Sequence, residues 1–305
     1  MKEPSGKILV IRGGAIGDFI LTLPVFAALR QHFPEAHLEV LGYPHIAQLA
    51  QAGALVDEVH SIEARALAGF FARGGSLDEQ LTNYFAGFAL IVSYLYDPDG
   101  IFQANVARCS KAQFIAGPHR PDDKLNLHAT EIFLKPLERL AIFDADPVPL
   151  LLLNFQRSAP NQLALHPGSG SEKKNWPEQN WRQLIEHLAL ATNLNLLLVG
   201  GEVEGDRLQW LAAALPRERI QLAQNLSLAE LARRLKCCFG FIGHDSGISH
   251  LAAAVGLPTL VLWGDTRQSI WRPRGDHVTV ITSPVGVGGI GVETVVAEAV
   301  RLFPG

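Results

Sequence analysis

The richest group of chemically active side chains lies between Gly243 and Ala254, which reads Gly-His-Asp-Ser-Gly-Ile-Ser-His-Leu-Ala-Ala-Ala. The preceding apolar run, Phe239–Ile242, is typical of a buried strand. Asp245 or Ser246 can cap a helix whose first turn carries His250. Because such a turn presents free backbone N–H groups and a positive dipole end, it is suited to a phosphorylated ligand. The alternative is an ordinary capped crossover in which His250 only packs.

A second group of interest lies near the N-terminus. Residues 7–12 predict a strand, the glycine-rich stretch 13–18 a turn, and the amphipathic run 19–32 a helix. Asp18 ends the turn, where it can act on a ligand or simply serve as the helix N-cap. The glycines do not have the G-x-G-x-x-G spacing, and no acidic residue ends the next strand. We therefore expect no nicotinamide or flavin dinucleotide.

A third loop follows the predicted strand Leu163–His166. It contains Ser169 and Lys174, and a helix is expected to restart near Pro177. Hydroxyls and a lysine in such a loop suit a diphosphate, although the adjacent Lys173 and Lys174 could equally be solvated surface charges. The spacing is not that of a P-loop.

The elements that must position these loops alternate strand with helix throughout, which predicts an α/β fold. The chain has 305 residues, a length that suits two domains of about 150 residues. We expect the domains to span 1–150 and 151–305, joined by a linker from Asp144 to about Pro160. Strands are expected at 7–12, 37–41, 56–60, 89–94, 112–116, 163–166, 194–199, 219–222, 239–242, 258–263 and 277–281.

Composition excludes several classes of protein. The formal net charge is -4, so there is no basic footprint for nucleic acid. No apolar run is long enough to span a membrane, and no secretory segment is visible. The three cysteines, Cys109, Cys237 and Cys238, and the histidines do not have the spacing of a zinc site. These features predict a cytoplasmic protein.

Two motifs are expected to carry no function. Residues 286–291 match G-x-G-x-x-G, but too little chain follows for a dinucleotide-binding unit, so we expect a flexible loop before a final helix at about 291–303. The Asp-x-Asp pairs at 97–99 and 144–146 resemble a metal motif. They fall in a turn and in the linker, where aspartates are common.

Taken together, the motifs resemble glycosyltransferase family 9, the family of the ADP-heptose:lipopolysaccharide heptosyltransferases. The resemblance covers nearly the whole chain. It is carried by Ile11-Arg12-x-Gly14-Ala15-Ile16-Gly17-Asp18 with Leu21-Thr22-Leu23-Pro24, by His166-Pro167-Gly168 with Lys174-x-Trp176-Pro177, by Asp245-Ser246-Gly247 with His250-Leu251-Ala252-Ala253-Ala254, and by Leu262-Trp263-Gly264-Asp265-Thr266 with Trp271-Arg272-Pro273.

The resemblance implies a GT-B architecture, with two Rossmann-like domains facing across a cleft and a last helix that crosses back to the first domain. It implies an inverting transferase in which Asp18 is the general base and Lys174 stabilises the leaving diphosphate. Donor contacts carried over from the family are Ser169, Gly170, Lys174, Glu204, Asp245, Ser246, Gly247 and His250. Acceptor contacts are expected at Arg12, Arg120 and Lys124, although the last two also fit plain surface charge.

The partners implied are a nucleotide-sugar donor, most simply ADP-heptose, and a lipid-linked or oligosaccharide acceptor of the lipopolysaccharide-core type. No metal or other cofactor is expected, and a peripheral position at the inner face of the cytoplasmic membrane would bring the enzyme to its acceptor. The sequence departs from the family at His244, where asparagine is often found, and at Ser246, where threonine is commoner. Two other classes remain open: a sugar-nucleotide epimerase of the same fold, and a non-catalytic nucleotide-binding protein in which Asp18 is only a cap.

Overall fold

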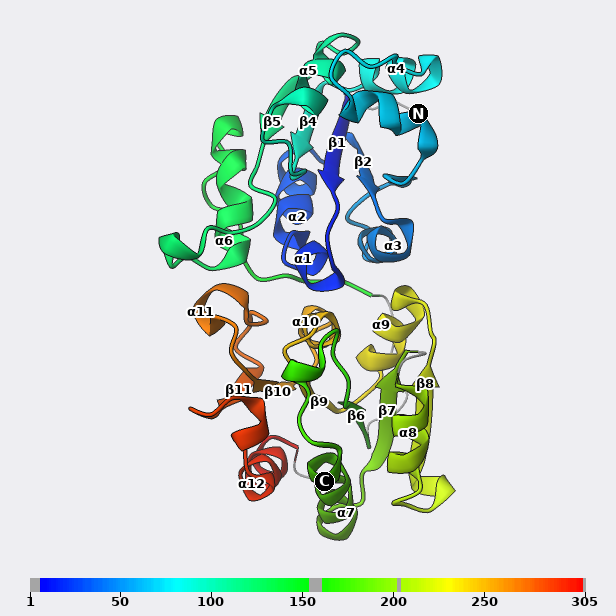
Figure 1. Cartoon of the computed structure of the whole chain (residues 1–305), viewed down its shortest axis with the longest axis vertical. Helices are drawn as coiled ribbons and strands as arrows, with labels where there is room; N and C mark the ends of the chain where they lie inside the picture. The colour runs from blue at the N-terminus through cyan, green and yellow to red at the C-terminus, as the bar shows by residue number, and fades with distance from the viewer. Residues whose placement is uncertain (1–5, 154–160, 202–203, 304–305) are drawn as a thin grey trace. The chain divides into compact units, whose positions relative to one another are not determined.

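The computed structural model describes residues 6–153, 161–201 and 204–303. The chain divides into two compact units, Met1–Pro147 and Val148–Gly305, and Figure 1 shows their strands and helices in chain order from blue to red. The expected linker begins at Asp144, and its residues 154–160 lie outside the described part of the chain.

The first unit is built from strands and helices in alternation. Its strands are β1 (Lys7–Arg12), β2 (His37–Gly42), β3 (Glu58–Ser61), β4 (Leu90–Ser93) and β5 (Gln113–Ala116). Its helices are α1 (Ile16–Ile20), α2 (Leu23–His32), α3 (Pro44–Ala52), α4 (Glu79–Ala86), α5 (Ile101–Ala107) and α6 (Ala129–Leu134), with 3-10 turns η1 (Arg65–Phe71), η2 (Asp123–Leu125) and η3 (Lys135–Leu140).

The second unit repeats this alternation. Its strands are β6 (Gln162–His166), β7 (Asn195–Gly200), β8 (Ile220–Gln224), β9 (Gly240–His244), β10 (Thr259–Trp263) and β11 (Val278–Thr282). Its helices are α7 (Glu178–Ala191), α8 (Gly205–Ala212), α9 (Leu228–Lys236), α10 (Gly247–Ala254), α11 (Gln268–Trp271) and α12 (Val292–Leu302), with 3-10 turns η4 (Glu172–Lys174), η5 (Arg217–Arg219) and η6 (Val287–Gly289).

Both sheets are parallel. In each sheet, the order of the strands reverses beside the strand that comes first along the chain. The first sheet has the order β3-β2-β1-β4-β5 and the second β11-β10-β9-β6-β7-β8. In open α/β sheets, ligands bind outside the carboxyl ends of the strands where the order reverses. The two reversals, β1 beside β4 and β6 beside β9, therefore mark the places where binding sites are expected.

The strands form where apolar runs were expected, with small shifts at their ends. Parallel strands covered on both faces read as continuous apolar stretches, and this is the pattern of the central strands. In β1 every residue from Ile8 to Arg12 is buried, and in β9 all five residues are buried. The α/β fold class expected from the sequence is thus confirmed.

The expected helix over residues 19–32 is two helices. α1 ends at Ile20 and α2 starts at Leu23, with Pro24 in the first turn of α2. Proline has no N–H to donate to the carbonyl four residues earlier, which here belongs to Ile20, so one continuous helix cannot form. The short α1 is the element that carries Asp18.

The C-terminal helix has contacts within the second unit. α12 packs against α7, and its residues Val295 and Ala299 are buried in the core of the second unit together with Phe303. Phe303 lies directly against the backbone of Gly240 in β9. These contacts anchor the end of the chain in the second unit, and the expected crossing to the first domain stays a prediction.

The glycine-rich stretch 286–291 is likewise held in place. It contains the 3-10 turn η6, and Val287 and Ile290 are buried in the core of the second unit. The Trp176 indole N–H donates to the Ile290 carbonyl at 2.8 Å. The expected flexible loop is therefore wrong, because two apolar side chains within the glycine pattern anchor it.

Candidate active site

Asp18 lies in the first turn of α1, just past the carboxyl end of β1. Its Oδ2 accepts a hydrogen bond from the N–H of Ala15, the N-cap residue, at 3.1 Å, so Asp18 acts as the third residue of a capping box and the expected N-cap role is corrected. A Cβ on Gly14 would lie 3.1 Å from Oδ2, a tight contact, and its φ of +99° favours glycine. The side chain of Asp18 is 31% exposed, so the carboxylate is partly accessible while the bond to Ala15 holds it in place.

Arg12 ends β1 and its side chain is only 2% exposed. Its guanidinium donates to the backbone carbonyls of His119 at 2.8 Å and Asp18 at 3.2 Å, and lies 4.5 Å from the centre of the Phe133 ring. Burial lowers the Arg12 pKa, and the nearby Asp18 carboxylate opposes that shift. The expectation that Arg12 binds an acceptor is corrected: this side chain joins the loops after β1 and β5 and supports Asp18.

Arg120 and Lys124 are both exposed. They lie in the loop after β5, which Arg12 contacts through His119. The Lys124 backbone N–H donates to Asp122 Oδ1 at 2.9 Å, so the Asp122 side chain caps the start of η2. The structure thus places both cations at the carboxyl end of the first sheet, where an acceptor role stays a prediction.

In the second unit, His244 links the loops that follow β6 and β9. Its Nε2 accepts from the Trp176 N–H at 2.8 Å and from the Trp181 indole N–H at 3.3 Å. These two donors leave the proton on Nδ1, which faces the Gly168 carbonyl at 3.2 Å. The departure from asparagine at this position therefore gives the β6 loop a buried aromatic anchor.

His166 ends β6 beside this anchor, and Ser246 Oγ lies 3.4 Å from its Nδ1. Burial is the main cause that lowers the His166 pKa to about 3, with His244 adding to the effect. Burial likewise lowers the His244 pKa to about 4. Both rings are therefore neutral at physiological pH, and neither supplies a cation for a phosphate.

These two histidines predict a loss of stability on acidification. Above about pH 6.5, the ordinary pKa of histidine, both rings are neutral in the folded and unfolded states. Their full contribution to the free energy of unfolding is therefore present. As the pH falls from about 6.5 toward 4, the unfolded chain binds protons that the folded chain does not, so the free energy of unfolding falls by up to about 1.4 kcal/mol per pH unit for each ring. Urea unfolding at successive pH values measures this slope.

The variant His244→Asn removes one of the two groups, so its stability should depend less steeply on pH over this range. His187→Asn is the matched control, because His187 is exposed on α7. If the free energy of unfolding had the same slope against pH in His244→Asn and in the unmodified protein, the lowered pKa of His244 would be contradicted.

Lys174 is held at the carboxyl end of β9 by Asp245. Its Nζ lies 2.7 Å from Asp245 Oδ2, and the Thr266 hydroxyl donates to the same oxygen. Asp245 is buried, whereas Lys174 is 36% exposed. The pair thus directs an accessible ammonium group toward the reversal point of the second sheet.

The run from Ser246 to His250 forms the start of α10. Ser246 occupies the N-cap position, but no backbone N–H of the helix donates to its hydroxyl, so the expected side-chain cap does not form there. The first backbone N–H groups of a helix have no acceptor within it, and Gly247 begins this helix half-buried. His250 is buried within the same turn.

Ser169 and Gly170 lie in the loop after β6. The Ser169 hydroxyl is 2.7 Å from both Asn175 Oδ1 and the Ser171 carbonyl, so it stabilises the loop that carries Lys174. Gly170 is exposed, and a side chain there would meet nothing within 4 Å. The absence of a Cβ at Gly170 is therefore not required by its protein surroundings.

Glu204 lies beside the same loop. Its Oε2 accepts from the Gly201 N–H at 2.9 Å, and a Cβ on Gly168 would lie 2.5 Å from its Oε1. Glycine is thus required at position 168 for the carboxylate to reach the β6 loop. The structure brings together Glu204, Lys174, Asp245 and Ser246 around the loops after β6, β7 and β9.

His166 and Thr266 also belong to this group, although neither was expected to be a site residue from the sequence. His166 ends a strand at the reversal point, which is a signal that becomes readable only once the strand order is known. Thr266 lies in a motif shared with the family, but its contact with Asp245 depends on the pairing of β9 with β10.

No described helix has the length and apolarity needed to cross a membrane.

Comparison with known proteins shows what this chain is similar to. Residues 144–287 match the model of glycosyltransferase family 9 (heptosyltransferase). Lipopolysaccharide heptosyltransferase 1 of Pseudomonas aeruginosa is 36% identical over 46% of this chain and 36% of its own length. Lipopolysaccharide heptosyltransferase 3 of Escherichia coli is 23% identical over 86% of this chain and 84% of its own. The chain thus spans about a third of the first relative and most of the second.

Solved structures show the same fold. A glycosyl transferase family 9 structure from Veillonella parvula has a TM-score of 0.80 at 16% identity, covering 100% of this chain and 99% of that one. The E. coli heptosyltransferase WaaC with ADP has a TM-score of 0.76 at 18% identity, covering 97% and 99%. Two parallel α/β units with these neighbours define the GT-B fold class. The family match over residues 144–287 and the heptosyltransferase relatives make this chain similar to glycosyltransferase family 9.

Proposed function

We propose that the chain transfers a heptose from ADP-heptose to a lipopolysaccharide-core acceptor, with inversion at the anomeric carbon. Support comes from the heptosyltransferase names of the relatives. The observation that carries the donor part is the accessible Lys174, held by Asp245 beside the start of α10. An ammonium group and a helix N-terminus both stabilise the negative charge that develops on a departing diphosphate.

In this proposal Asp18 removes the proton from the acceptor hydroxyl as that oxygen attacks the anomeric carbon. The bond from that carbon to the diphosphate breaks, and the diphosphate leaves with its electron pair. Ser169, Gly170, Glu204, Ser246, Gly247 and His250 form the donor pocket, and Asp245 acts through Lys174. Arg120 and Lys124 offer cations to an anionic acceptor. In the proposed mechanism, Lys174 and the N-terminus of α10 take the role that a metal ion would have. We also propose that the enzyme works at the inner face of the cytoplasmic membrane.

The epimerase alternative requires acid and base groups on both sides of a sugar, and the family match favours transfer. A non-catalytic binding protein would retain the nucleotide pocket without using Asp18. Measuring product formation from ADP-heptose separates all three classes, because only the transferase couples ADP release to a longer acceptor.

Binding of the nucleotide is the first prediction to test. We expect ADP at 100 times its dissociation constant to raise the free energy of unfolding by about 2.7 kcal/mol, measured as a shift in melting temperature, with smaller shifts for UDP, GDP and NAD. Lys174→Ala should lose most of the ADP shift relative to its own ligand-free melting temperature. Lys173→Ala is the matched control, since Lys173 is exposed and adjacent in sequence. A larger shift of the melting temperature with UDP or GDP would indicate a UDP- or GDP-linked donor in place of ADP-heptose. No shift with any diphosphate would overturn the proposal.

A further inference from the structure

A second polar cluster lies in the first sheet, on strands that carry none of the proposed transfer residues. It consists of His37 and Glu39 on β2 with Glu58 and His60 on β3, and we call it the β2–β3 cluster. Residues two apart on a strand project from the same face. The parallel register pairs Glu39 with Glu58 and Leu41 with His60, so all four side chains share one face.

The distances in the β2–β3 cluster are those of ligand atoms around one cation. His37 Nε2 lies 3.3 Å from Glu39 Oε1 and 3.5 Å from Glu58 Oε2. One ligand atom from each of these three residues lies within 4.8 Å of the others. Tetrahedral zinc has ligands at about 2.0–2.2 Å, which places neighbouring ligand atoms about 3.4 Å apart.

His60 approaches the same carboxylates from the other side. Its Nε2 lies 3.0 Å from Glu39 Oε2 and 3.4 Å from Glu58 Oε1. Glu39 is 1% exposed, and its carboxylate also has a side-chain hydrogen bond with Tyr84. A buried carboxylate is costly unless it is paired, and a bound cation would add a partner for it.

The charges of the cluster favour a cation. Two carboxylates placed opposite each other on adjacent strands repel, and Lys7 supplies one compensating charge through Glu39 Oε1 at 3.0 Å. The neighbouring Asp57 is neutralised by Arg30 at 2.7 Å. Apart from the imidazoles, two carboxylates and one lysine leave a net negative charge. Lys7 is 46% exposed, so its ammonium can withdraw when a metal ion takes its place.

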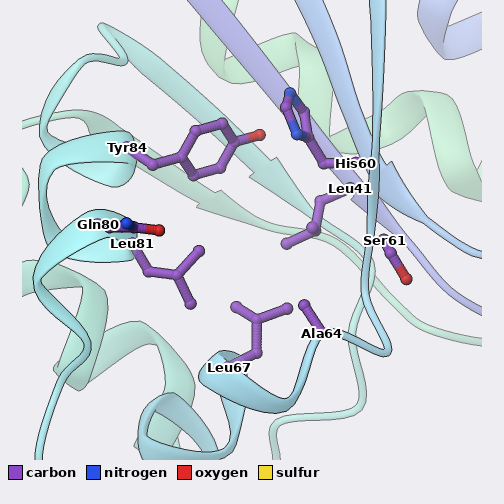
Figure 2. Close-up of a pocket in the computed structure, with 8 residues that line it drawn as sticks. All are labelled: Leu41, His60, Ser61, Ala64, Leu67, Gln80, Leu81 and Tyr84. Carbon is purple, nitrogen blue, oxygen red and sulfur yellow. The ribbon is translucent and has the colours of Figure 1, made fainter.

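The cluster has a supporting shell and an access route. A cavity of about 230 Å³ is lined by Leu41, His60, Ser61, Ala64, Leu67, Gln80, Leu81 and Tyr84. Figure 2 shows the Tyr84 hydroxyl directed toward His60 at one end of this cavity. Burial and the charge of Glu39 raise the Tyr84 pKa, so the phenol stays protonated beside the cluster. Glu58 is 52% exposed, which opens the other side to solvent.

We propose that the β2–β3 cluster binds one divalent cation of the zinc class, with His37, Glu39 and Glu58 as ligands and His60 beside the two carboxylates. Neutral imidazole nitrogens with carboxylate oxygens are the donor set that zinc accepts. The ion joins β3, which is an edge strand, to β2. Its role is to hold the edge of the sheet, separately from the transfer reaction.

The test uses the full chain, stripped with a chelator and then titrated with zinc chloride in a calorimeter. We expect one equivalent of Zn²⁺ to bind, with slower hydrogen exchange in β3. Glu58→Gln should weaken binding by more than about 100-fold, since loss of an outer-shell partner alone costs about 10–100-fold. Glu58 is half-exposed, so this variant does not depend on refilling a core. Glu63→Gln is the matched control, because Glu63 is an exposed acid close by in sequence.

Two further variants separate a metal site from an ordinary ion-pair network. Lys7→Met removes the competing cation, so it should strengthen zinc binding, whereas a purely structural network would show no gain. Substituted Co²⁺ should give an intense visible absorption in the unmodified protein and lose it in His37→Asn, with His187→Asn unchanged. Failure of zinc to bind the unmodified chain, or equal binding by Glu58→Gln and Glu63→Gln, would overturn the proposal. The ADP-induced melting shift is measured independently and is expected to be unaffected by zinc.

Discussion

Asp18→Asn is expected to lower kcat by about 10²–10⁴-fold, the usual contribution of a general base, which corresponds to about 2.7–5.5 kcal/mol in activation free energy. The substitution keeps the shape of the side chain and an oxygen for the Ala15 N–H. The hydrogen bonds of Arg12 and Thr22 with this residue go to its backbone carbonyl, so they are retained, whereas the ion pair of Arg12 Nη2 with Asp18 Oδ1 at 3.9 Å is lost. The fold should therefore survive, and the loss should appear in turnover.

The measurement is steady-state release of ADP from the sugar donor with a saturating acceptor. Asp78→Asn is the matched control, because Asp78 also caps a helix of the first unit, by accepting from the Leu81 N–H at 3.0 Å. Asp78→Asn should leave kcat unchanged. If Asp18→Asn and Asp78→Asn had the same activity, Asp18 would be a helix cap alone.

Arg12→Ala is expected to destabilise the first unit by about 3–6 kcal/mol. The guanidinium makes two hydrogen bonds to backbone carbonyls, and bonds from a charged donor contribute about 1.5–3 kcal/mol each. Removing it leaves both carbonyls without this donor and opens a cavity against Tyr94 and Phe133. Chemical denaturation followed by circular dichroism gives the change in the free energy of unfolding.

Lys124→Ala serves as the control for Arg12→Ala, because Lys124 is exposed and surface changes of this kind stay within about 0.5 kcal/mol. Arg12→Lys should fall between the two, since lysine keeps the charge without the planar fork that reaches both carbonyls. A mild effect of Arg12→Ala, equal to that of Lys124→Ala, would show that Arg12 does not support the loops.

Much of the fold could be predicted because its strands are apolar runs that end in glycine or polar residues. β1, β6 and β9 are found this way, and so are the loops that follow them, which is why Asp18, Lys174 and Asp245 were candidates. The break before α2 was missed because Leu21 and Thr22 preserve the helical period, and only the missing N–H of Pro24 decides the matter. The anchoring of 286–291 was missed because glycines suggested mobility, while Val287 and Ile290 supply the buried contacts.

The remaining errors come from long-range packing. An arginine at the end of a strand can face a ligand or the core. The burial of Arg12 depends on Phe133 and on the carbonyl of His119, which are both more than a hundred positions away along the chain. The β2–β3 cluster was also missed. His37 and Glu39 are two apart, as are Glu58 and His60, but only the register of β2 with β3 brings the pairs together. Spacing along the chain contains no such information.

The bond from Arg12 to the His119 carbonyl has a consequence for engineering acceptor preference. Arg12 joins Asp18 to the neighbouring loop through backbone carbonyls, so a change of side chain at Lys124 leaves both of these bonds in place. A library randomised at Lys124, with His119 and its flanking chain left intact, would vary a proposed acceptor contact while the bonds of Arg12 stay constant.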